Sequence, residues 1–327
     1  MCGIIGYVGS RDASKVVVEG LRRMEYRGYD SAGVAVIADG AIDFRKKAGK
    51  ITNLDAEIAA DPLAESGLGI GHTRWATHGG PTDYNAHPHV SANGRVALIH
   101  NGIIENFAPL RAELEAQGVQ FRSETDSEVA AQLLGKAVED GTDLADAMRS
   151  VCKRLHGAFT LVAVDTAEPA RLVAARRNSP LVVGVGDGEN FVASDVAAFI
   201  EFTRHAIELG QDQVVDVTAE QVIVTDFDGR PAASHPFEVT WDLSAAEKQG
   251  YDWFMRKEIY EQPQAVADTL LGRYNTDGSL KLDELHIPEE ELRTIDKIII
   301  VACGTAYYAG MVAKYAIEHW TRIACEV

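Results

Sequence analysis

The first residues of the chain that suggest chemistry are Met1, Cys2 and Gly3. A side chain as small as that of cysteine permits removal of Met1, which would leave Cys2 with a thiol and a free α-amine. An α-amine has an ordinary pKa of about 7.7–8.0, so it can serve as the adjacent base that a nucleophilic thiol needs. The sequence therefore indicates an N-terminal nucleophile. The alternative is a short buried strand over residues 3–9, beside which Cys2 has no chemical role.

Asn101 and Gly102 follow a strand expected over Arg95–Ile99. An Asn-Gly pair at the end of a strand is commonly a turn. It can also direct a side-chain amide and a backbone N–H at one point, as an oxyanion hole requires. Both interpretations stay open at this stage.

Asp126 lies at the start of an expected helix, where Thr125 and Glu128 have the spacing of a capping box. The helix dipole favours an acid in the first turn of a helix in any protein. A substrate-binding role for Asp126 therefore competes with a structural one.

Two loops are rich in charged, aromatic and glycine residues. The first, Glu25–Gly33, has the composition of a binding wall or a lid. The second follows a strand expected over Gly69–Trp75 and continues through Thr77-His78-Gly79. Further along, His87 and His89 form an H-x-H pair. We interpret them as hydrogen-bonded loop histidines, because a proline separates them and carboxylates are absent nearby, so we expect no metal site.

The composition is that of a globular protein, with 46% hydrophobic and 24% charged residues over 327 positions, enough for two domains. Lys and Arg number 31 against 49 Asp and Glu, and the net charge of −18 disfavours nucleic acid or an acidic membrane as a partner. No apolar run reaches the length of a membrane span. The four cysteines are widely spaced and no secretory signal precedes them, so we expect free thiols and a cytoplasmic location.

Residues 158–239 read mostly as strands, whereas the helices before them are grouped separately, which predicts an α+β fold with antiparallel sheets. Asp12 or Ser14 is expected to cap a first helix and Asn106 a later one. An Asp39-Gly40 turn predicts a hairpin. The expected strands are Val34–Ile37, Ala41–Arg45, Phe159–Val164, Leu172–Ala175, Leu181–Val185, Phe191–Ser194, Val214–Val217, Gln221–Thr225 and Phe237–Thr240.

The C-terminal part differs in pattern. Trp241–Gly250 reads as a polar linker and Asp252–Leu271 as an amphipathic helix that Pro263 kinks or breaks. Lys297–Ala302 reads as a buried strand of a parallel sheet, and a helix should follow Cys303-Gly304-Thr305. With only the start of another strand after that helix, we expect an incomplete domain.

Five motifs occur in order and spacing: Cys2-Gly3-Ile4-Ile5-Gly6, Arg27-Gly28-Tyr29-Asp30-Ser31, His72-Thr73-Arg74-Trp75-Ala76-Thr77-His78-Gly79, Asn101-Gly102 and Ser123-Glu124-Thr125-Asp126. Together they resemble the N-terminal-nucleophile glutamine amidotransferases. The segments Met255–Pro263 and Ala302–Thr305 are similar to the members of that family that pass ammonia to fructose 6-phosphate.

The resemblance implies an α+β fold, a four-layer αββα N-terminal-nucleophile hydrolase sandwich, followed by an incomplete α/β domain of the sugar-isomerase (SIS) type. The implied boundaries are residues 2–240 for the glutaminase domain, 241–296 for a linker and helical segment, and 297–327 for the start of the SIS domain.

The resemblance also implies a role for individual residues. Cys2 is the nucleophile, and the Asn101 side chain and the Gly102 N–H form the oxyanion hole. The residues implied for glutamine binding are Arg74, Thr77 and His78 at the α-carboxylate and Asp126, as an exposed acid, at the α-ammonium. The residues implied for gating the ammonia path and covering the site are Trp75, Arg27, Gly28 and Tyr29. The residues implied for a partial sugar-phosphate site are Cys303, Gly304 and Thr305, with Ala306 where relatives often carry serine.

The expected function is hydrolysis of the glutamine side-chain amide, with the ammonia delivered in a full-length homodimeric enzyme to fructose 6-phosphate to make glucosamine 6-phosphate. No cofactor is implied, and the present chain alone is expected to show glutaminase activity only. Two alternatives remain at this stage: an amidotransferase with another acceptor, such as phosphoribosyl pyrophosphate or aspartate, and a non-catalytic glutamine-binding subunit.

Overall fold

The computed structural model describes residues 2–240, 251–270 and 287–327. These residues fall into two compact units, Met1–Phe254 and Met255–Val327. The linker expected at Trp241–Gly250 and the helix end expected at Leu271 lie outside the described residues.

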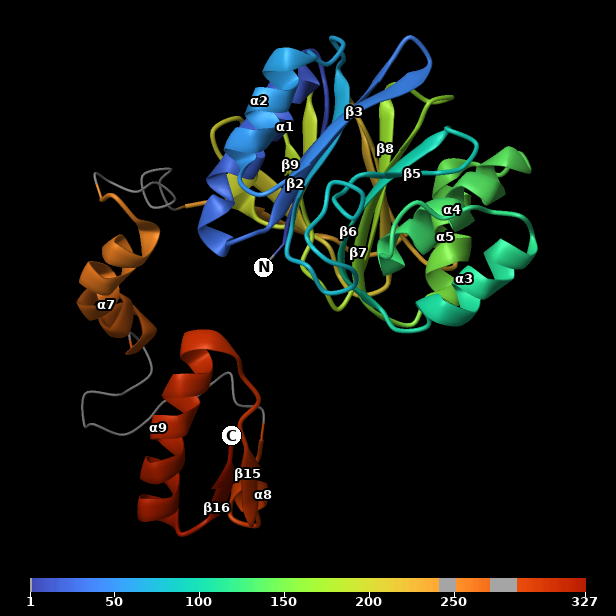
Figure 1. The fold of residues 1–327 in the computed structure, drawn as a ribbon. Helices are drawn as coiled ribbons and strands as arrows, with labels where there is room; N and C mark the ends of the chain where they lie inside the picture. The colour runs from blue at the N-terminus through green and yellow to red at the C-terminus, as the bar shows by residue number, and fades with distance from the viewer. Residues whose placement is uncertain (1, 241–250, 271–286) are drawn as a thin grey trace. The chain divides into compact units, whose positions relative to one another are not determined.

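Two antiparallel sheets form the centre of the first unit (Figure 1). The eight-stranded sheet has the order β14 (His235–Glu238), β11 (His205–Glu208), β9 (Val182–Val185), β10 (Asn190–Ala193), β1 (Gly3–Val8), β4 (Leu68–Arg74), β2 (Ser31–Ala38) and β3 (Ala41–Ala48). The six-stranded sheet has the order β13 (Val222–Asp226), β12 (Gln213–Thr218), β8 (Arg171–Arg177), β7 (Gly157–Asp165), β6 (Val96–Ile104) and β5 (His89–Val90).

Helices cover the outer face of each sheet (Figure 1). The eight-stranded sheet is covered by α1 (Ala13–Arg23) and α2 (Ile51–Ala60), and two short 3₁₀ turns, η1 (Glu25–Arg27) and η2 (Val196–Ala198), contact α1. The six-stranded sheet is covered by α3 (Phe107–Ala116), α4 (Asp126–Glu139) and α5 (Leu144–Arg154). Asp12 caps α1, because its Oδ1 accepts from the Ser14 N–H at 3.1 Å, as expected.

Alternation of side chains along the strands explains the four layers, because neighbouring residues point to opposite faces of a sheet. On β1, Ile4 packs between the two sheets and Ile5 packs under the helices. On β6, Ile99 likewise packs between the sheets, whereas Leu98 packs under α3–α5. The α+β prediction of an αββα sandwich is therefore confirmed.

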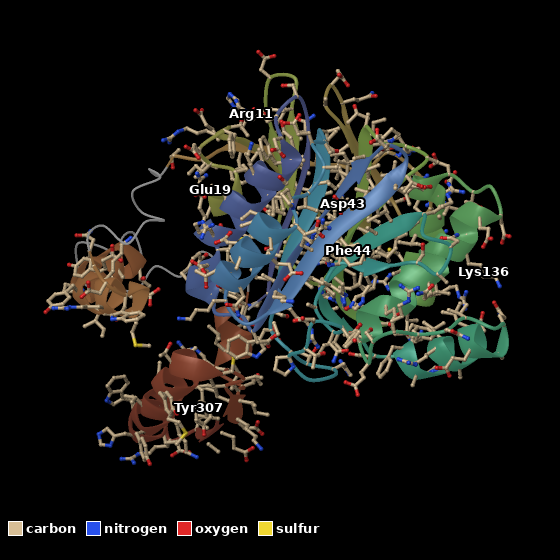
Figure 2. All side chains as sticks on the ribbon, turned by 45° about the horizontal axis from the view of Figure 1, so that its top comes forward. Arg11, Glu19, Asp43, Phe44, Lys136 and Tyr307 are labelled. Atoms are coloured by element: carbon tan, nitrogen blue, oxygen red, sulfur yellow. The ribbon has the colours of Figure 1, made fainter. Side chains whose placement is uncertain are left out.

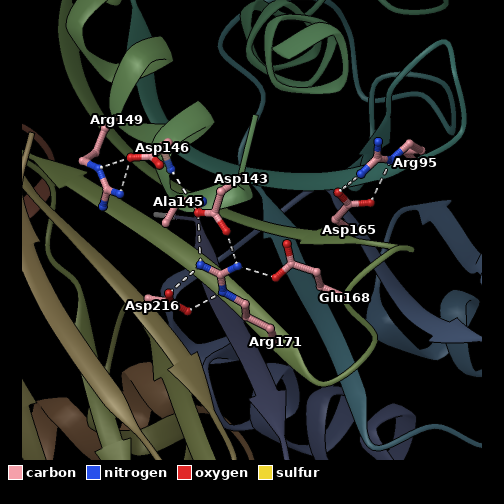
Figure 3. A network of polar contacts seen from close by, with 9 residues as sticks. All are labelled: Arg95, Asp143, Ala145, Asp146, Arg149, Asp165, Glu168, Arg171 and Asp216. Atoms are coloured by element: carbon pink, nitrogen blue, oxygen red, sulfur yellow. Dashed lines mark hydrogen bonds and ion pairs between the residues drawn. The ribbon is translucent and has the colours of Figure 1, made fainter. Parts of the chain in front are cut away.

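A network of ion pairs holds the start of α5 against the six-stranded sheet (Figure 3). Arg171 on β8 donates to both carboxylate oxygens of Asp216 on β12, at 2.7 and 2.6 Å. The same guanidinium donates at 2.7 Å to Asp143, the N-cap of α5, and lowers the pKa of that carboxyl below its ordinary value. Nearby, Arg95 forms an ion pair with the buried Asp165 at 2.5 Å.

The sequence missed or misplaced several elements. β11 was not expected, and β14 ends at Glu238 and not at Thr240. Asn106 precedes α3 but its side chain makes no capping bond. Its amide instead accepts from the His156 N–H at 2.9 Å and donates to the Arg154 carbonyl at 2.8 Å. The prediction failed because an amide has both a donor and an acceptor, and here both are used by a tertiary contact.

The second unit contains, among the described residues, α7 (Phe254–Leu270), α8 (Glu289–Leu292), β15 (Lys297–Ile299), α9 (Gly304–Thr321) and β16 (Ala324–Glu326). Pro263 lies inside α7, which continues on both sides of it. β15 pairs in parallel with β16, as expected.

The expected buried strand over Lys297–Ala302 was wrong in length and in burial. It ends at Ile299, and the exposed fractions of Ile299 and Val301 are 64% and 93%. In the described part of the unit, the two strands and the helix between them, α9, offer too little surface to cover both faces of a parallel sheet. Tyr307 lies on α9 (Figure 2). Its ring forms an edge-to-face pair with that of Tyr308, with ring centroids 5.6 Å apart.

Candidate active site

Cys2 lies where two strands of the eight-stranded sheet end together. β1 and β4 are antiparallel, with Gly3 opposite Thr73, so Cys2 lies beside the residues that follow β4. The Trp75 N–H donates to Sγ of Cys2 at 3.1 Å, and Sγ lies 3.7 Å from the Trp75 carbonyl oxygen, to which the thiol can donate. The sequence therefore places a thiol against a backbone donor.

The environment of Cys2 keeps its sulfur protonated at neutral pH. Burial raises the pKa of the thiol above its ordinary value, and the Trp75 N–H and the Arg74 guanidinium only partly oppose this effect. Because the thiolate is the nucleophilic form, a reaction at Cys2 near neutral pH requires a base. Met1 lies outside the described residues.

Asn101 reaches Cys2 from the facing sheet. Its Nδ2 lies 3.4 Å from the carbonyl oxygen of Cys2. The expected alternative of a turn at Asn101-Gly102 was wrong, because both residues lie inside β6 and pair with Thr160 and Phe159 of β7. The ladder continues past them because β7 stays in register with β6 as far as Gly157.

Gly102 has a backbone conformation that favours glycine, with φ of +120°. A Cβ at this position would lie 2.0 Å from the carbonyl oxygen of Ala158 on β7. No other residue fits without moving the strand. Glycine thus allows β6 to keep its pairing while Asn101, its neighbour, reaches the sulfur-bearing residue.

Arg74 is buried at the end of β4 and holds the loop that follows it. Its guanidinium donates to the carbonyl oxygens of His78, Gly79 and Gly80. Burial lowers its pKa from the ordinary value. The sequence predicts that this guanidinium binds a carboxylate, but in this structure its N–H groups donate to backbone carbonyl oxygens of its own loop. Thr77, in the same loop, is exposed.

Asp126 is the first residue of α4, and the sequence-based view of it as an exposed acid was wrong. Its exposed fraction is 3%, and its Oδ2 accepts from the Ile104 N–H at 2.8 Å. Oδ1 lies 3.9 Å from Nδ1 of His78. The acid is buried because the helix start packs on the end of β6, which supplies a backbone donor to it. Asp126 and His78 are thus close neighbours.

The capping box at the start of α4 forms only in part. The Thr125 hydroxyl accepts from the Glu128 N–H at 3.2 Å, as predicted. The Glu128 carboxylate does not return to Thr125; it accepts from the Ser123 N–H at 2.7 Å and from the Ser123 hydroxyl at 2.6 Å. Glu128 therefore closes the loop before the helix.

The expected lid residues divide into two groups. Arg27 donates to the Cys2 carbonyl at 3.4 Å and to Asp195 at 2.5 Å. Gly28 has φ of +74°, and a Cβ there would lie 3.0 Å from the Trp75 ring.

Tyr29 is directed away from Cys2. Its hydroxyl accepts from the N–H of Ile51, at the start of α2, at 2.8 Å and contacts Glu25. The Trp75 side chain itself has an exposed fraction of 55%.

The expected sugar-phosphate residues lie in the second unit. Cys303 is the N-cap position of α9 without a capping side-chain bond, and Gly304 has φ of +61°. Cys303, Gly304 and Thr305 are all exposed.

Four buried histidines, to which the sequence assigned no catalytic role, lie behind Asn101. Nε2 of His72 is 2.8 Å from Oδ1 of Asn101, and Nδ1 of His87 is 2.8 Å from Nδ1 of His72. His89 bonds the Thr125 hydroxyl and His100 the Ser127 hydroxyl, at 2.9 and 2.8 Å.

Burial lowers the pKa of all four histidines, that of His72 to about 3. The described residues include no group of three or more His, Cys, Asp or Glu that could hold a metal ion. Because their pKa values are lowered, the four histidine side chains are neutral hydrogen-bonding groups at neutral pH.

Asp30 is another residue whose contacts the sequence did not reveal. Its carboxylate accepts from the Ala76 N–H at 2.5 Å, and its own N–H donates to the Arg74 carbonyl at 2.7 Å. Asp30 thus binds the residues on both sides of Trp75, Arg74 and Ala76, and holds the Trp75 N–H that faces Cys2 in place. Its place in the Arg-Gly-Tyr-Asp-Ser motif was the only signal in the sequence.

Comparison with known proteins agrees with this geometry. Residues 72–201 match the glutamine amidotransferase domain family. The whole chain is 64% identical to a glutamine–fructose-6-phosphate aminotransferase (isomerizing) of Streptomyces coelicolor and 62% identical to one of Corynebacterium glutamicum. Over residues 72–201 the chain carries a glutamine amidotransferase domain.

The chain spans about half the length of the curated relatives it matches: all of it aligns, with 53% of the Streptomyces protein and 54% of the Corynebacterium protein. Among solved structures, a glutamine phosphoribosylpyrophosphate amidotransferase from B. subtilis matches 69% of this chain and 49% of its own chain, with a TM-score of 0.59 and 27% identity. Among the residues that the structure describes, no helix is both long and apolar enough to cross a membrane.

Proposed function

We propose that the first unit hydrolyses the side-chain amide of glutamine with Cys2 as the nucleophile. The observation that carries this proposal is the meeting of three groups from two sheets: the Cys2 sulfur, the Trp75 N–H that faces it, and the Asn101 amide beside the Cys2 carbonyl. Attack on an amide carbonyl needs a thiol, an adjacent base and fixed donors for the oxyanion, and the α-amine of Cys2 can be that base.

The chemistry begins with removal of Met1, which frees the α-amine of Cys2. This amine takes the proton of the thiol, and the sulfur attacks the carbonyl carbon of the glutamine side chain. Asn101 Nδ2 and the Gly102 N–H donate to the oxygen that becomes negative. The protonated amine then returns its proton to the departing nitrogen, which leaves as ammonia, and water hydrolyses the thioester to release glutamate.

The α-substituents of glutamine are held by the residues around the loop after β4. Asp126, close to His78, receives the α-ammonium, and Arg74 receives the α-carboxylate, assisted by Thr77 and His78. Support for this comes from the burial of Asp126 and Arg74, since buried charges need partners. Arg74 presently donates to three carbonyls, so the carboxylate would share or replace those acceptors. Arg27 and Gly28 cover the site, and Trp75 gates the path of ammonia.

The acceptor in the proposed reaction is fructose 6-phosphate, and the product is glucosamine 6-phosphate, made by a homodimeric cytoplasmic enzyme of the relatives' full length. The support is the identity of 64% to a protein named for that acceptor and the exposed helix start at Cys303, Gly304 and Thr305, in which backbone N–H groups favour a phosphate. The proposed domains are residues 2–240, 241–296 and, as the start of an SIS domain, 297–327.

The test uses the purified 327-residue chain with glutamine. Release of equal amounts of glutamate and ammonia is expected, together with addition of one equivalent of an electrophilic glutamine analogue to Cys2 by mass spectrometry. Absence of glutamate release from the folded chain with Met1 removed would contradict the proposal. With fructose 6-phosphate added, the chain should form no amino sugar, whereas a protein of the relatives' full length that contains it should.

A further inference from the structure

The carboxamide of Asn101 is held at both ends. Its Nδ2 faces the carbonyl oxygen of Cys2 at 3.4 Å, and its Oδ1 faces Nε2 of His72 at 2.8 Å. A carbonyl oxygen only accepts hydrogen bonds, so the amide nitrogen must be the atom on the Cys2 side. It follows that Oδ1 is directed at His72 and that His72 must donate to it.

This orientation determines the tautomer of His72. The ring is fully buried and neutral, so it carries one proton, and that proton is on Nε2. Nδ1 is then an acceptor, and the atom facing it at 2.8 Å is Nδ1 of His87, which must be the donor. Nδ1 of His87 also lies 3.2 Å from Nε2 of His72, but that nitrogen is already a donor.

The hydrogen bonds therefore run in one direction, from His87 to His72 to Asn101 and on toward Cys2. All three side chains have exposed fractions of 7% or less. The segment that carries His87 is held as well, because the ammonium of Lys46 donates to the carbonyl oxygens of Tyr84, Ala86 and Pro88 at 3.2, 2.8 and 3.2 Å.

We propose that His72 is a positioning residue that keeps the amide N–H of Asn101 directed at the reacting oxygen, and that His87 fixes the tautomer of His72 that does so. The inference rests on the proposed glutaminase function and extends it to two side chains that do not touch the substrate. Without the His72 donor, the Asn101 amide can turn over and present an oxygen, which would repel the developing oxyanion.

A purely structural role for His72 makes a different prediction. A histidine that only fills the core would affect stability, and any polar replacement would act like an apolar one of similar size. A positioning residue affects kcat, and the effect depends on whether the replacement can donate at the place of Nε2. The two roles are separated by the pair His72→Leu and His72→Gln.

The experiment measures kcat and KM for glutamine and the melting temperature of each variant. His72→Leu should lower kcat by about 10- to 100-fold with KM within about 3-fold, since a small misplacement of a reacting group has effects of this size. His72→Gln, whose amide nitrogen can donate to Asn101, should recover most of kcat. In the Asn101→Ala background, His72→Leu should cause little further loss of kcat.

The matched control is His100→Leu, which removes an equally buried histidine whose ring bonds Ser127 and not Asn101. It should lower the melting temperature while leaving kcat within about 3-fold of the unmodified chain. An equal loss of kcat in His100→Leu and His72→Leu, or no recovery in His72→Gln, would overturn the inference. The hydrogen bond from His87 to His72 is tested in the same way. His87→Asn keeps a donor near the place of Nδ1 and should retain a higher kcat than His87→Leu.

A second measurement does not depend on activity or on variants that fold. Nitrogen–proton NMR correlations of the imidazole rings in the unmodified chain should show His72 protonated at Nε2 and His87 at Nδ1. The opposite tautomer at His72 would overturn the inference. If the unmodified chain does not hydrolyse glutamine, the proposed function fails whatever the tautomers are. If it does, and His72→Leu keeps full kcat, the function stands and only this inference fails.

Discussion

The backbone N–H of Trp75 points at the sulfur of Cys2 across 3.1 Å. This bond joins the first residue before β1 to the first residue after β4, although 73 positions separate them in the sequence. Arg74 directly precedes Trp75, and a Cβ at Gly28 would lie 3.0 Å from the Trp75 ring, so the loop after β4, the Glu25–Gly33 loop and Cys2 all adjoin Trp75. The loop after β4, which we propose binds the α-substituents of glutamine, and the sulfur are therefore joined through one peptide unit.

Cys2→Ala should abolish glutamate release, because the remaining cysteines are not placed against such a donor. Cys152 lies fully buried on α5, and burial raises its pKa far above the ordinary value, so it is inert. Cys152→Ala should retain activity close to that of the unmodified chain. The measurement is glutamate formed per chain and minute. Substantial activity in Cys2→Ala would show that the nucleophile has been assigned to the wrong residue.

Asp126→Asn should raise KM for glutamine at least about tenfold, because the variant loses the charge that we propose pairs with the α-ammonium. The amide oxygen of asparagine still accepts from the Ile104 N–H, so the fold should be retained. The comparison variant is Thr125→Ala, which removes the helix cap and should cost about 0.5–2 kcal/mol of stability with KM unchanged. Steady-state kinetics and thermal melts of both variants decide the point. A normal KM in Asp126→Asn would leave the acid with a structural role only.

Asn101→Ala should lose about 10²–10³ in kcat while still binding glutamine, because one of the two proposed oxyanion donors is removed. Asn101 pairs in the ladder through its backbone, so the alanine variant should still fold. Kinetics at saturating glutamine, with a thermal melt as the folding control, provide the measurement. If kcat is unchanged in a folded variant, the oxyanion is stabilised by other groups.

The stability of the first unit should fall steeply below about pH 6.5, the ordinary pKa of histidine. His72 has its folded-state pKa lowered to about 3 by burial, so between about pH 3 and 6.5 the unfolded chain binds a proton that the folded chain does not. Stability is therefore fully present above pH 6.5 and is lost as the pH falls through this window. Each such histidine contributes up to about 1.4 kcal/mol per pH unit.

Denaturant unfolding at several pH values checks this, with His72→Gln as the comparison. The variant should show a smaller loss of stability between pH 6.5 and 5 than the unmodified chain, because one buried titrating group has been removed. An unchanged pH dependence would mean that His72 is protonated in the folded state.

The sequence was sufficient for features that depend on local pattern. The strand after Cys2, the hairpin at Asp39-Gly40 and the α1 cap at Asp12 all follow from alternation, turn chemistry or capping, and all are present. It was also sufficient to select Asn101 as a residue of interest. It was not sufficient to show that β6 continues through Asn101, since that depends on β7 lying alongside it.

The features that could not be predicted are contacts between distant segments. The burial of Asp126 depends on the N–H of Ile104, and the role of Asn106 depends on the connection between α5 and β7. The chain of His87, His72 and Asn101 joins both sheets and a loop. None of these pairs has a spacing that pattern analysis recognises, because each exists only after the two sheets are packed.

The position of β1 within its sheet has a consequence for the timescales of the site. β1 lies between β10 and β4 and all its residues are buried, so its amide hydrogens should exchange with solvent only when the whole unit unfolds. The loop after β4 has exposed residues at Trp75, Thr77 and Gly80, and its amides should exchange through local opening. Cys2, the proposed nucleophile, thus directly precedes the slowest-exchanging strand of the unit, whereas the loop beside it exchanges fast. Heat should accordingly change the affinity for glutamine at temperatures at which the thiol is still held in place.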